Sequence, residues 1–195
     1  MAKEEHWIKE ALKLFLSEGI RGVTIGTLSR HLGVSSKTLY QHFGDKQGLV
    51  KACLGLHQEK VGEVYRGLAE EGQDAAEVFT RYYHTQIERL IRTHPSFFRD
   101  VRYYFPDSNQ QKVFFCEPQT RELLLRGQTE GLFQPGVNHD LAAATLTLLM
   151  QSIFEGHTFG AYGTRELMTQ VLWPYLRGLC TQAGMEAFRK HRPED

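Results

Sequence analysis

Residues 24–43 read TIGTLSRHLGVSSKTLYQHF, and this stretch decides the fold. Thr24 is a good N-cap for a short helix whose apolar residues recur at helical spacing. Gly33 stops that helix, because the chain reverses there and glycine tolerates a positive φ. Ser35 starts a second short helix, which ends at Gly44. The spacing therefore predicts two helices joined by a tight turn, the pattern of a helix-turn-helix.

The second helix of this pair has an outward polar face. A small core forms between the two helices from Leu28, Leu32, Val34, Leu39 and Phe43. The side chains left on the outside of the second helix are Ser36, Lys37, Tyr40 and Gln41. Such a helix fits the major groove of DNA, with base edges and phosphates near its N-terminus.

The charge distribution favours the same interpretation. The chain of 195 residues has 23 basic and 23 acidic side chains and a net charge of zero. Within 21–51, however, five basic residues stand against Asp45 alone. A local basic segment on a neutral protein suits a DNA-reading module. The alternative is an ordinary solvated charged face.

The cysteines and the hydropathy of the chain indicate where in the cell the protein is expected. The three cysteines, Cys53, Cys116 and Cys180, are far apart and odd in number. This argues against a disulfide scaffold and for a reducing, cytoplasmic location. No segment approaches the roughly 20 apolar residues that a membrane span needs, so we expect no membrane partner.

The rest of the chain is also predicted to be helical, with no hairpin signal and no repeat. We expect a first helix ending at Gly19, a fourth helix starting at Asp45 and ending within 62–73, and later segments at 74–94, 96–105, 108–131, 138–158 and 164–184. Pro118 should split or kink the 108–131 segment, and Pro174 should bend the last one.

The residues of this motif are similar to those of a known protein family. The stretch 24–43 closely resembles the DNA-binding domain of the TetR family of bacterial regulators. The resemblance continues through Gly44-Asp45-Lys46-Gln47-Gly48-Leu49 and reaches back to Phe15-Leu16-Ser17-Glu18-Gly19. It implies an all-α fold, with an N-terminal three-helix DNA-binding domain at 1–50, a connecting helix and loop at 51–73, and a C-terminal helical bundle at 74–195 that binds an effector and dimerises.

The resemblance also implies roles for single residues. Ser36, Lys37 and Tyr40 would face the groove. Phosphates would be held by Thr24, Thr38, Gln41, His42 and Lys46, with Ser35 at the helix N-terminus beside them. Gly26 and Ser29 depart from the usual pattern, and Gly26 removes a potential side-chain contact, so base reading rests more heavily on the second helix of the motif.

Aromatic residues are dense in the middle of the chain. Ten of the 22 aromatic residues fall within 79–115, more than an ordinary helical core of that size needs. An apolar pocket uses such a set together with a few polar groups, and the resemblance implies an effector pocket there. The predicted lining is Phe79, Tyr82, Tyr83, Gln86, Phe97, Phe98, Arg102, Tyr103 and Phe114, with His84 and Arg99 as further polar candidates. The alternative is plain core packing.

Two apolar stripes near the C-terminus predict an association surface. The first consists of Leu141, Thr145, Leu148, Leu149, Ser152 and Ile153. The second consists of Val171, Leu172, Tyr175, Leu176 and Leu179. Two such helices from each subunit would form an intermolecular four-helix bundle with two-fold symmetry. Alternatively, the stripes cover the chain's own core.

Other function classes find little support in the sequence. No glutamate is followed by a histidine three residues on, and there is no His-Glu-x-x-His, Gly-x-Ser-x-Gly or phosphate loop. We therefore expect no enzyme, no catalytic or metal site and no cofactor. A helical scaffold that binds no DNA remains as a third class. We predict a homodimeric regulator, released from double-stranded operator DNA by a small apolar or aromatic effector and acting as a repressor, with activation as the alternative.

Overall fold

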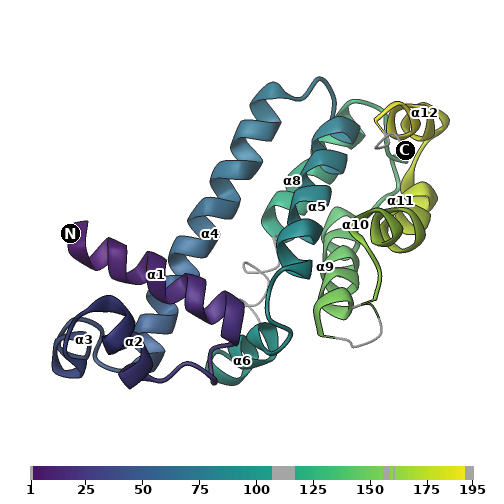
Figure 1. Cartoon of the computed structure of the whole chain (residues 1–195). Coiled ribbons are helices and arrows are strands. Elements are labelled where there is room, and N and C mark those ends of the chain that lie inside the picture. The colour runs from purple at the N-terminus through teal and green to yellow at the C-terminus, as the bar shows by residue number, and fades with distance from the viewer. Residues whose placement is uncertain (1, 107–116, 156–158, 160, 192–195) are drawn as a thin grey trace. The chain divides into compact units, whose positions relative to one another are not determined.

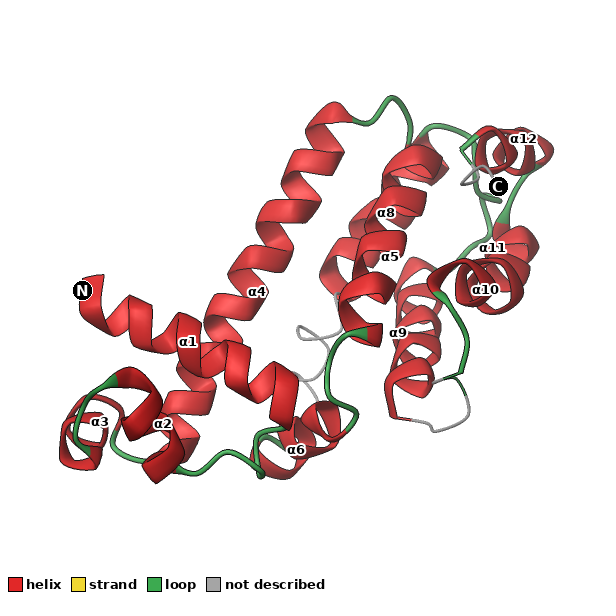
Figure 2. Cartoon of the chain, in the orientation of Figure 1, coloured by secondary structure: helices red, strands yellow, loops and turns green. Residues whose placement is uncertain are grey.

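The computed structural model describes residues 2–106, 117–155, 159 and 161–191. Over these residues the chain consists of helices joined by loops and turns, without a strand, as Figure 2 shows. The predicted all-α fold is confirmed. Among the described helices, none is both long enough and apolar enough to cross a bilayer.

The contacts divide the chain into two compact units. Unit 1 combines Met1–Lys60 with Arg92–Gln111, and unit 2 combines Val61–Ile91 with Lys112–Asp195. The predicted domain boundaries at 50 and 73 stay a prediction.

Unit 1 contains the quoted stretch (Figure 1). Its helices are α1 (Ala2–Glu18), α2 (Ile25–Leu32), α3 (Ser36–Phe43), the first part of α4 (Lys46–Glu71), and α6 (Ser96–Tyr104). The core between them is apolar and includes the fully buried side chains of Phe15, Ile20, Leu28, Leu39, Leu49 and Val50. The predicted α2 and α3 are therefore confirmed, and Leu28 and Leu39 hold them together.

Capping explains where α2 and α3 begin and end. The Thr24 hydroxyl accepts a hydrogen bond from the Thr27 N–H at 3.0 Å, and Ser35 does the same for Thr38. Gly33 ends α2 with φ of 65°, the left-handed region that the turn requires. Each predicted cap is confirmed.

Helix α6 packs within unit 1, although it follows α5 in the chain. Its buried Asp100 accepts a hydrogen bond from the Arg21 N–H at 2.9 Å. The Gln47 side chain donates to the Tyr104 carbonyl at 3.0 Å, and the His94 N–H donates to the Leu16 carbonyl at 2.7 Å. These bonds attach α6 to the end of α1 and to the start of α4.

Unit 2 is a separate helical bundle. Besides the rest of α4 it contains α5 (Ala75–Ile91), α8 (Glu117–Thr129), α9 (His139–Glu155), α10 (Thr164–Leu167), a π-helical turn η1 (Met168–Leu172), α11 (Trp173–Leu179) and α12 (Gln182–Lys190). Helix α8 packs against both α5 and α9. Ring contacts join α5 to α12, with Phe79 stacked on Tyr83 at 4.4 Å and 5.8 Å from Phe188.

One predicted helix of unit 2 needs correction, and another lies partly outside the described residues. Of the predicted 108–131 segment the structure describes only the part from 117 on, where Pro118 lies in the first turn of α8 and its missing N–H breaks no bond; the predicted split or kink of the whole segment stays a prediction. The segment at 164–184 is not one helix. It widens into η1 ahead of Pro174, which stands in the first turn of α11, and Cys180 then pairs with Phe133.

After this break, Thr181 caps the separate helix α12.

Candidate nucleic-acid interface

The outward face of α3 is exposed. Lys37, Tyr40 and Gln41 lie one turn apart on the same side of the helix, and Tyr40 is 49% exposed. Leu39 points the opposite way into the core of unit 1. Within the residues that the structure describes, these three polar side chains have no hydrogen-bond partner. Their donor and acceptor groups are therefore available to another molecule.

Ser36, predicted to face the groove, is instead partly engaged inside unit 1. Its hydroxyl lies 2.9 Å from that of Ser29, which is buried on α2. The serine at position 29 thus links α2 to α3 by a hydrogen bond. The sequence pattern identified Ser29 only as a mild packing change, since the bond depends on how the two helices cross. Base contact by Ser36 stays a prediction.

The predicted phosphate-binding hydroxyls cluster at two helix N-termini. Thr24 pairs with Thr27 at 3.0 Å, and Ser35 pairs with Thr38 at 2.8 Å. The hydroxyls of Thr24 and Ser35 also accept from backbone N–H groups, so the positive ends of α2 and α3 lie beside polar side chains. This arrangement suits an anion such as a phosphate.

Lys46 begins α4, where Asp45 accepts a hydrogen bond from the Gly48 N–H at 2.7 Å. Partial burial lowers the pKa of Lys46, an effect that the charge of Asp100 opposes and that of Arg21 adds to. Lys46 and Arg21 therefore lie close enough for their positive charges to interact, with Asp100 of α6 near Lys46. Arg21 belongs to the basic segment 21–51, but the sequence pattern predicts no role for it.

His42, the remaining predicted phosphate contact, packs against α1. Its ring lies 5.0 Å from that of Trp7 in an edge-on arrangement and contacts Phe43 as well. The side chain is nevertheless exposed. His42 therefore supports the docking of α3 on α1, and its phosphate contact stays a prediction.

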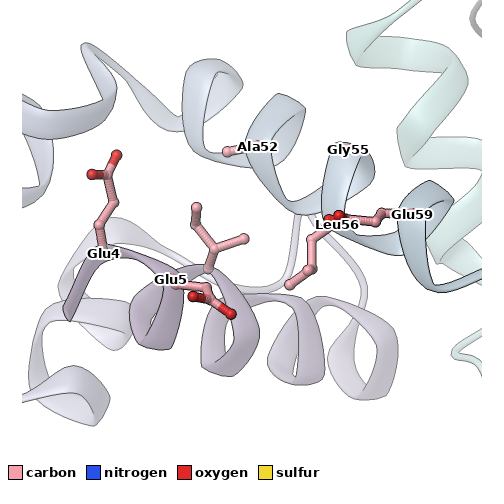
Figure 3. Close-up of a pocket in the computed structure, with 7 residues that line it drawn as sticks. Glu4, Glu5, Ala52, Gly55, Leu56 and Glu59 are labelled. Carbon is pink, nitrogen blue, oxygen red and sulfur yellow. The ribbon is translucent and has the colours of Figure 1, made fainter. Parts of the chain in front are cut away.

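The seam of α1 and α4 is acidic. A hollow of about 460 Å³ there is lined by Glu4, Glu5, Ile8, Ala52, Gly55, Leu56 and Glu59, and Figure 3 shows the acidic side chains of Glu4, Glu5 and Glu59 along it. Glu5 pairs with Lys9 at 2.5 Å, which lowers the pKa of Glu5. Carboxylates repel phosphate, so this surface of unit 1 is unsuited to DNA, in contrast to the basic residues around α3.

The predicted pocket residues fall into two groups. Phe79, Tyr82, Tyr83 and Gln86 are buried on α5 in unit 2. Phe97, Phe98, Arg102 and Tyr103 lie on α6 in unit 1, and Phe114 lies outside the described residues. Tyr103 is 69% exposed, with the Arg21 guanidinium 5.1 Å from its ring centroid. A pocket shared by the whole set stays a prediction.

The other polar candidates lie on the same two helices. His84 on α5 is half-buried, and Arg99 on α6 is exposed.

The predicted dimer surface is partly exposed. Leu141 and Leu148 on α9 are 68% and 60% exposed, and Ser152 is exposed on the same stripe. Thr145, Leu149, Val171, Tyr175 and Leu179 are half-buried. Ile153, Leu172 and Leu176 are buried within unit 2, and the dimer role of the whole set stays a prediction.

Comparisons with known proteins agree with the sequence pattern. Residues 8–53 match the family described as bacterial regulatory proteins, tetR family. A stretch of 60 residues is 30% identical to the HTH-type transcriptional regulator AcrR of Shigella flexneri. This match covers 31% of the chain and spans 28% of the length of AcrR.

Solved structures share the fold over most of the chain. A TetR-family regulator from Rhodococcus sp. is similar with a TM-score of 0.72 and 20% identity, over 93% of this chain and all of the other. RolR in complex with resorcinol is similar with a TM-score of 0.66 and 21% identity, over 100% of this chain and 95% of the other. At such identities the likeness concerns the fold alone.

Proposed function

Since the chain belongs to the tetR family of bacterial regulatory proteins, we propose that it is a ligand-responsive repressor, which binds a pseudo-palindromic operator as a homodimer. Proteins of this family are DNA-binding transcription factors and not enzymes, in agreement with the sequence analysis. We further propose a cytoplasmic location.

The observation that carries the proposal is the exposed face of α3. Lys37, Tyr40 and Gln41 stand on it, backed by the buried Leu39. A short amphipathic helix with this face fits a major groove, where lysine and tyrosine side chains reach base edges. The capped N-termini of α2 and α3 and the basic pair Arg21 and Lys46 support phosphate binding beside it.

Dimerisation sets the geometry of recognition. Two copies joined through the exposed stripe of α9 would present two α3 helices, and operators of this kind have half-sites about 34–36 Å apart. Leu141 and Leu148 support this, since apolar side chains grouped at a surface mark an interaction site.

The effector acts by differential affinity. A small apolar or aromatic molecule that binds better to the form unable to span the operator shifts the equilibrium away from DNA. The similarity to RolR, whose structure contains resorcinol, supports a small aromatic effector. The protein represses while it is bound to the operator, and such release relieves the repression.

The experiment is capture of fragmented genomic DNA by the purified protein, followed by gel retardation of the captured fragments at low salt. We expect discrete retarded complexes with a subset of fragments. The double variant Lys37→Ala with Tyr40→Phe should lose that selectivity. Uniform weak binding to all fragments, or no binding at all, would refute the proposal of a sequence-specific regulator. The helical scaffold that binds no DNA would then be the remaining interpretation.

A further inference from the structure

A buried hydroxyl in unit 2 lacks a hydrogen bond. Thr147 lies in the middle of α9 and is only 5% exposed. Its Oγ1 atom meets no donor or acceptor anywhere in the described part of the chain. Buried polar atoms in proteins are nearly always paired, so a specific exception needs a reason.

The sequence offers Thr147 an easy partner that it does not use. A helical hydroxyl can donate to the carbonyl four residues earlier. In unit 2 this bond is made by Thr80, Thr85, Thr129, Thr145, Ser152 and Thr169. Thr147 does not make this bond to Ala143, so its hydroxyl is left without the partner that the helix offers.

Gln86 on α5 presents a second case. The side chain is 4% exposed, and its Nε2 amide has no acceptor among the residues described. One turn earlier on α5, the Tyr83 hydroxyl lies 2.6 Å from that of Thr120 on α8. The interior of this unit therefore pairs some of its polar groups and leaves an amide donor and a hydroxyl unpaired.

The buried polar side chains described in unit 2 are all uncharged. They are Thr80, Gln86, Thr120 and Thr147. Arg89, one turn beyond Gln86, is half-buried and already interacts within the chain. Apart from Arg89, which buries its Nη1 atom but already interacts within the chain, a charged molecule in this interior would meet no buried counter-charge among the described residues, and a buried charge without one is strongly unfavourable.

We propose that the effector is an uncharged, oxygen-bearing molecule. Its oxygen accepts a hydrogen bond from the Gln86 amide and forms a second hydrogen bond with the Thr147 hydroxyl. The inference rests on the proposed function and names the chemistry of its effector. The aromatic side chains of α5 contact the apolar body of the molecule, and the two polar groups orient it. A hydrocarbon would leave both groups unpaired.

The first test concerns the protein without any added compound. Thr147→Val and Gln86→Met remove the unpaired groups while keeping the side-chain volume similar. We expect each variant to keep the wild-type Tm or to raise it by about 2–4 °C. Thr120→Val is the matched control, because its equally buried hydroxyl is paired with Tyr83, and it should lower the Tm. A fall in Tm for Thr147→Val as large as in the control would overturn the inference.

The second test uses matched probes at millimolar concentration in a thermal-shift assay. The probes are 4-ethylphenol and cyclohexanone, their hydrocarbons ethylbenzene and cyclohexane, and their carboxylates 4-ethylbenzoate and cyclohexanecarboxylate. We expect an uncharged oxygen-bearing probe to raise the Tm of the wild type most, and that advantage to vanish in Thr147→Val and Gln86→Met. Equal shifts with a hydrocarbon, a larger shift with a carboxylate, or no shift with any probe would contradict the inference.

DNA binding by the same preparations separates this inference from the function on which it rests. If genomic fragments are retarded but the probes do not give the expected thermal shifts, the proposed effector chemistry is wrong. The proposal that the protein is a DNA-binding regulator then still holds. If no fragment is retarded, the regulator itself fails, whatever the probes do.

Discussion

At the scale of single residues, base reading depends on Lys37 and Tyr40. Both are exposed on α3 without a partner in the described chain, so their substitution leaves the core of unit 1 intact. We expect Lys37→Ala or Tyr40→Phe to change the preferred bases, with about 1–3 kcal/mol lost where a good base contact disappears. Selection from a random DNA library measures this. A profile identical to that of the wild type would exclude base reading by that side chain.

Lys46 should act on phosphate and not on sequence. We expect Lys46→Ala to weaken binding about equally for all DNA sequences and to reduce the salt slope by about one counterion per half-site. Titrations at several salt concentrations measure that slope. Lys60→Ala is the matched control, because it removes the same charge from α4 roughly 21 Å further along the helix. An unchanged slope for Lys46→Ala would rule out its phosphate contact.

At this scale a sequence predicts which residues are exposed better than which hydrogen bonds they make. Lys37 and Tyr40 could be predicted to be exposed because helical periodicity fixes which side faces the core. The bond between Ser29 and Ser36 could not, since it depends on the approach of two helices. Pairing of Asp100 with the Arg21 backbone joins residues far apart in sequence and leaves no local pattern.

At the scale of elements, α12 is attached to α5 by an acid-sensitive pair. His191 lies 3.1 Å from Asp74, which also accepts a hydrogen bond from the Glu77 N–H at 2.8 Å. Partial burial acts to raise the pKa of Asp74, but the hydrogen bonds from Glu77 and His191 outweigh it and hold the pKa below 3.8. The stability from ionised Asp74 is therefore present above pH 3.8 and is lost as pH falls through the lowered value.

We expect Asp74→Ala to lower the free energy of unfolding at pH 7 by about 1–2 kcal/mol, because a helix cap is lost. The difference from the wild type should narrow as the pH falls below 3.8 and through the lowered pKa of Asp74, where the carboxylate of the folded wild type becomes protonated. Urea denaturation at pH 7 and at a pH below 3.8 measures this difference in the free energy of unfolding. A difference that stays constant with pH would show that the carboxylate charge does not hold the pair.

Helix positions could be predicted where caps and glycines mark them, as for α2 and α3. The prediction of one continuous helix over 164–184 was wrong because the apolar periodicity continues through Cys180. The break there comes from pairing of Cys180 with Phe133, a contact made by tertiary packing. Thr181, a good N-cap followed by a helical pattern, is the local signal for α12, although a continuous helix fits the same periodicity.

At the scale of the whole molecule, recognition of an inverted repeat requires two copies. We expect Leu148→Asp to weaken dimerisation at least about tenfold, because it would bury a carboxylate in an apolar interface. Sedimentation velocity measures the association. Leu125→Asp is the control, since Leu125 is an exposed leucine on α8 outside the predicted stripes. A Leu148→Asp protein that remains fully dimeric would place the interface elsewhere.

The two units differ in how far the sequence could be interpreted. Residues 8–53 carry the family match and a motif whose spacing is tied to one task. Unit 2 carries only helical periodicity and aromatic density, which are common to cores and pockets. The unpaired groups of Thr147 and Gln86 have no sequence signature, because a threonine on a helix normally bonds to its own backbone.

The central claim is that two copies of α3 enter one duplex, and binding-site selection from a random DNA library with the wild-type protein tests it most directly. The account predicts enrichment of an inverted repeat whose half-sites are centred about one helical turn apart, roughly 10–10.5 base pairs. Enrichment of an unpaired half-site, or of no sequence at all, would contradict it.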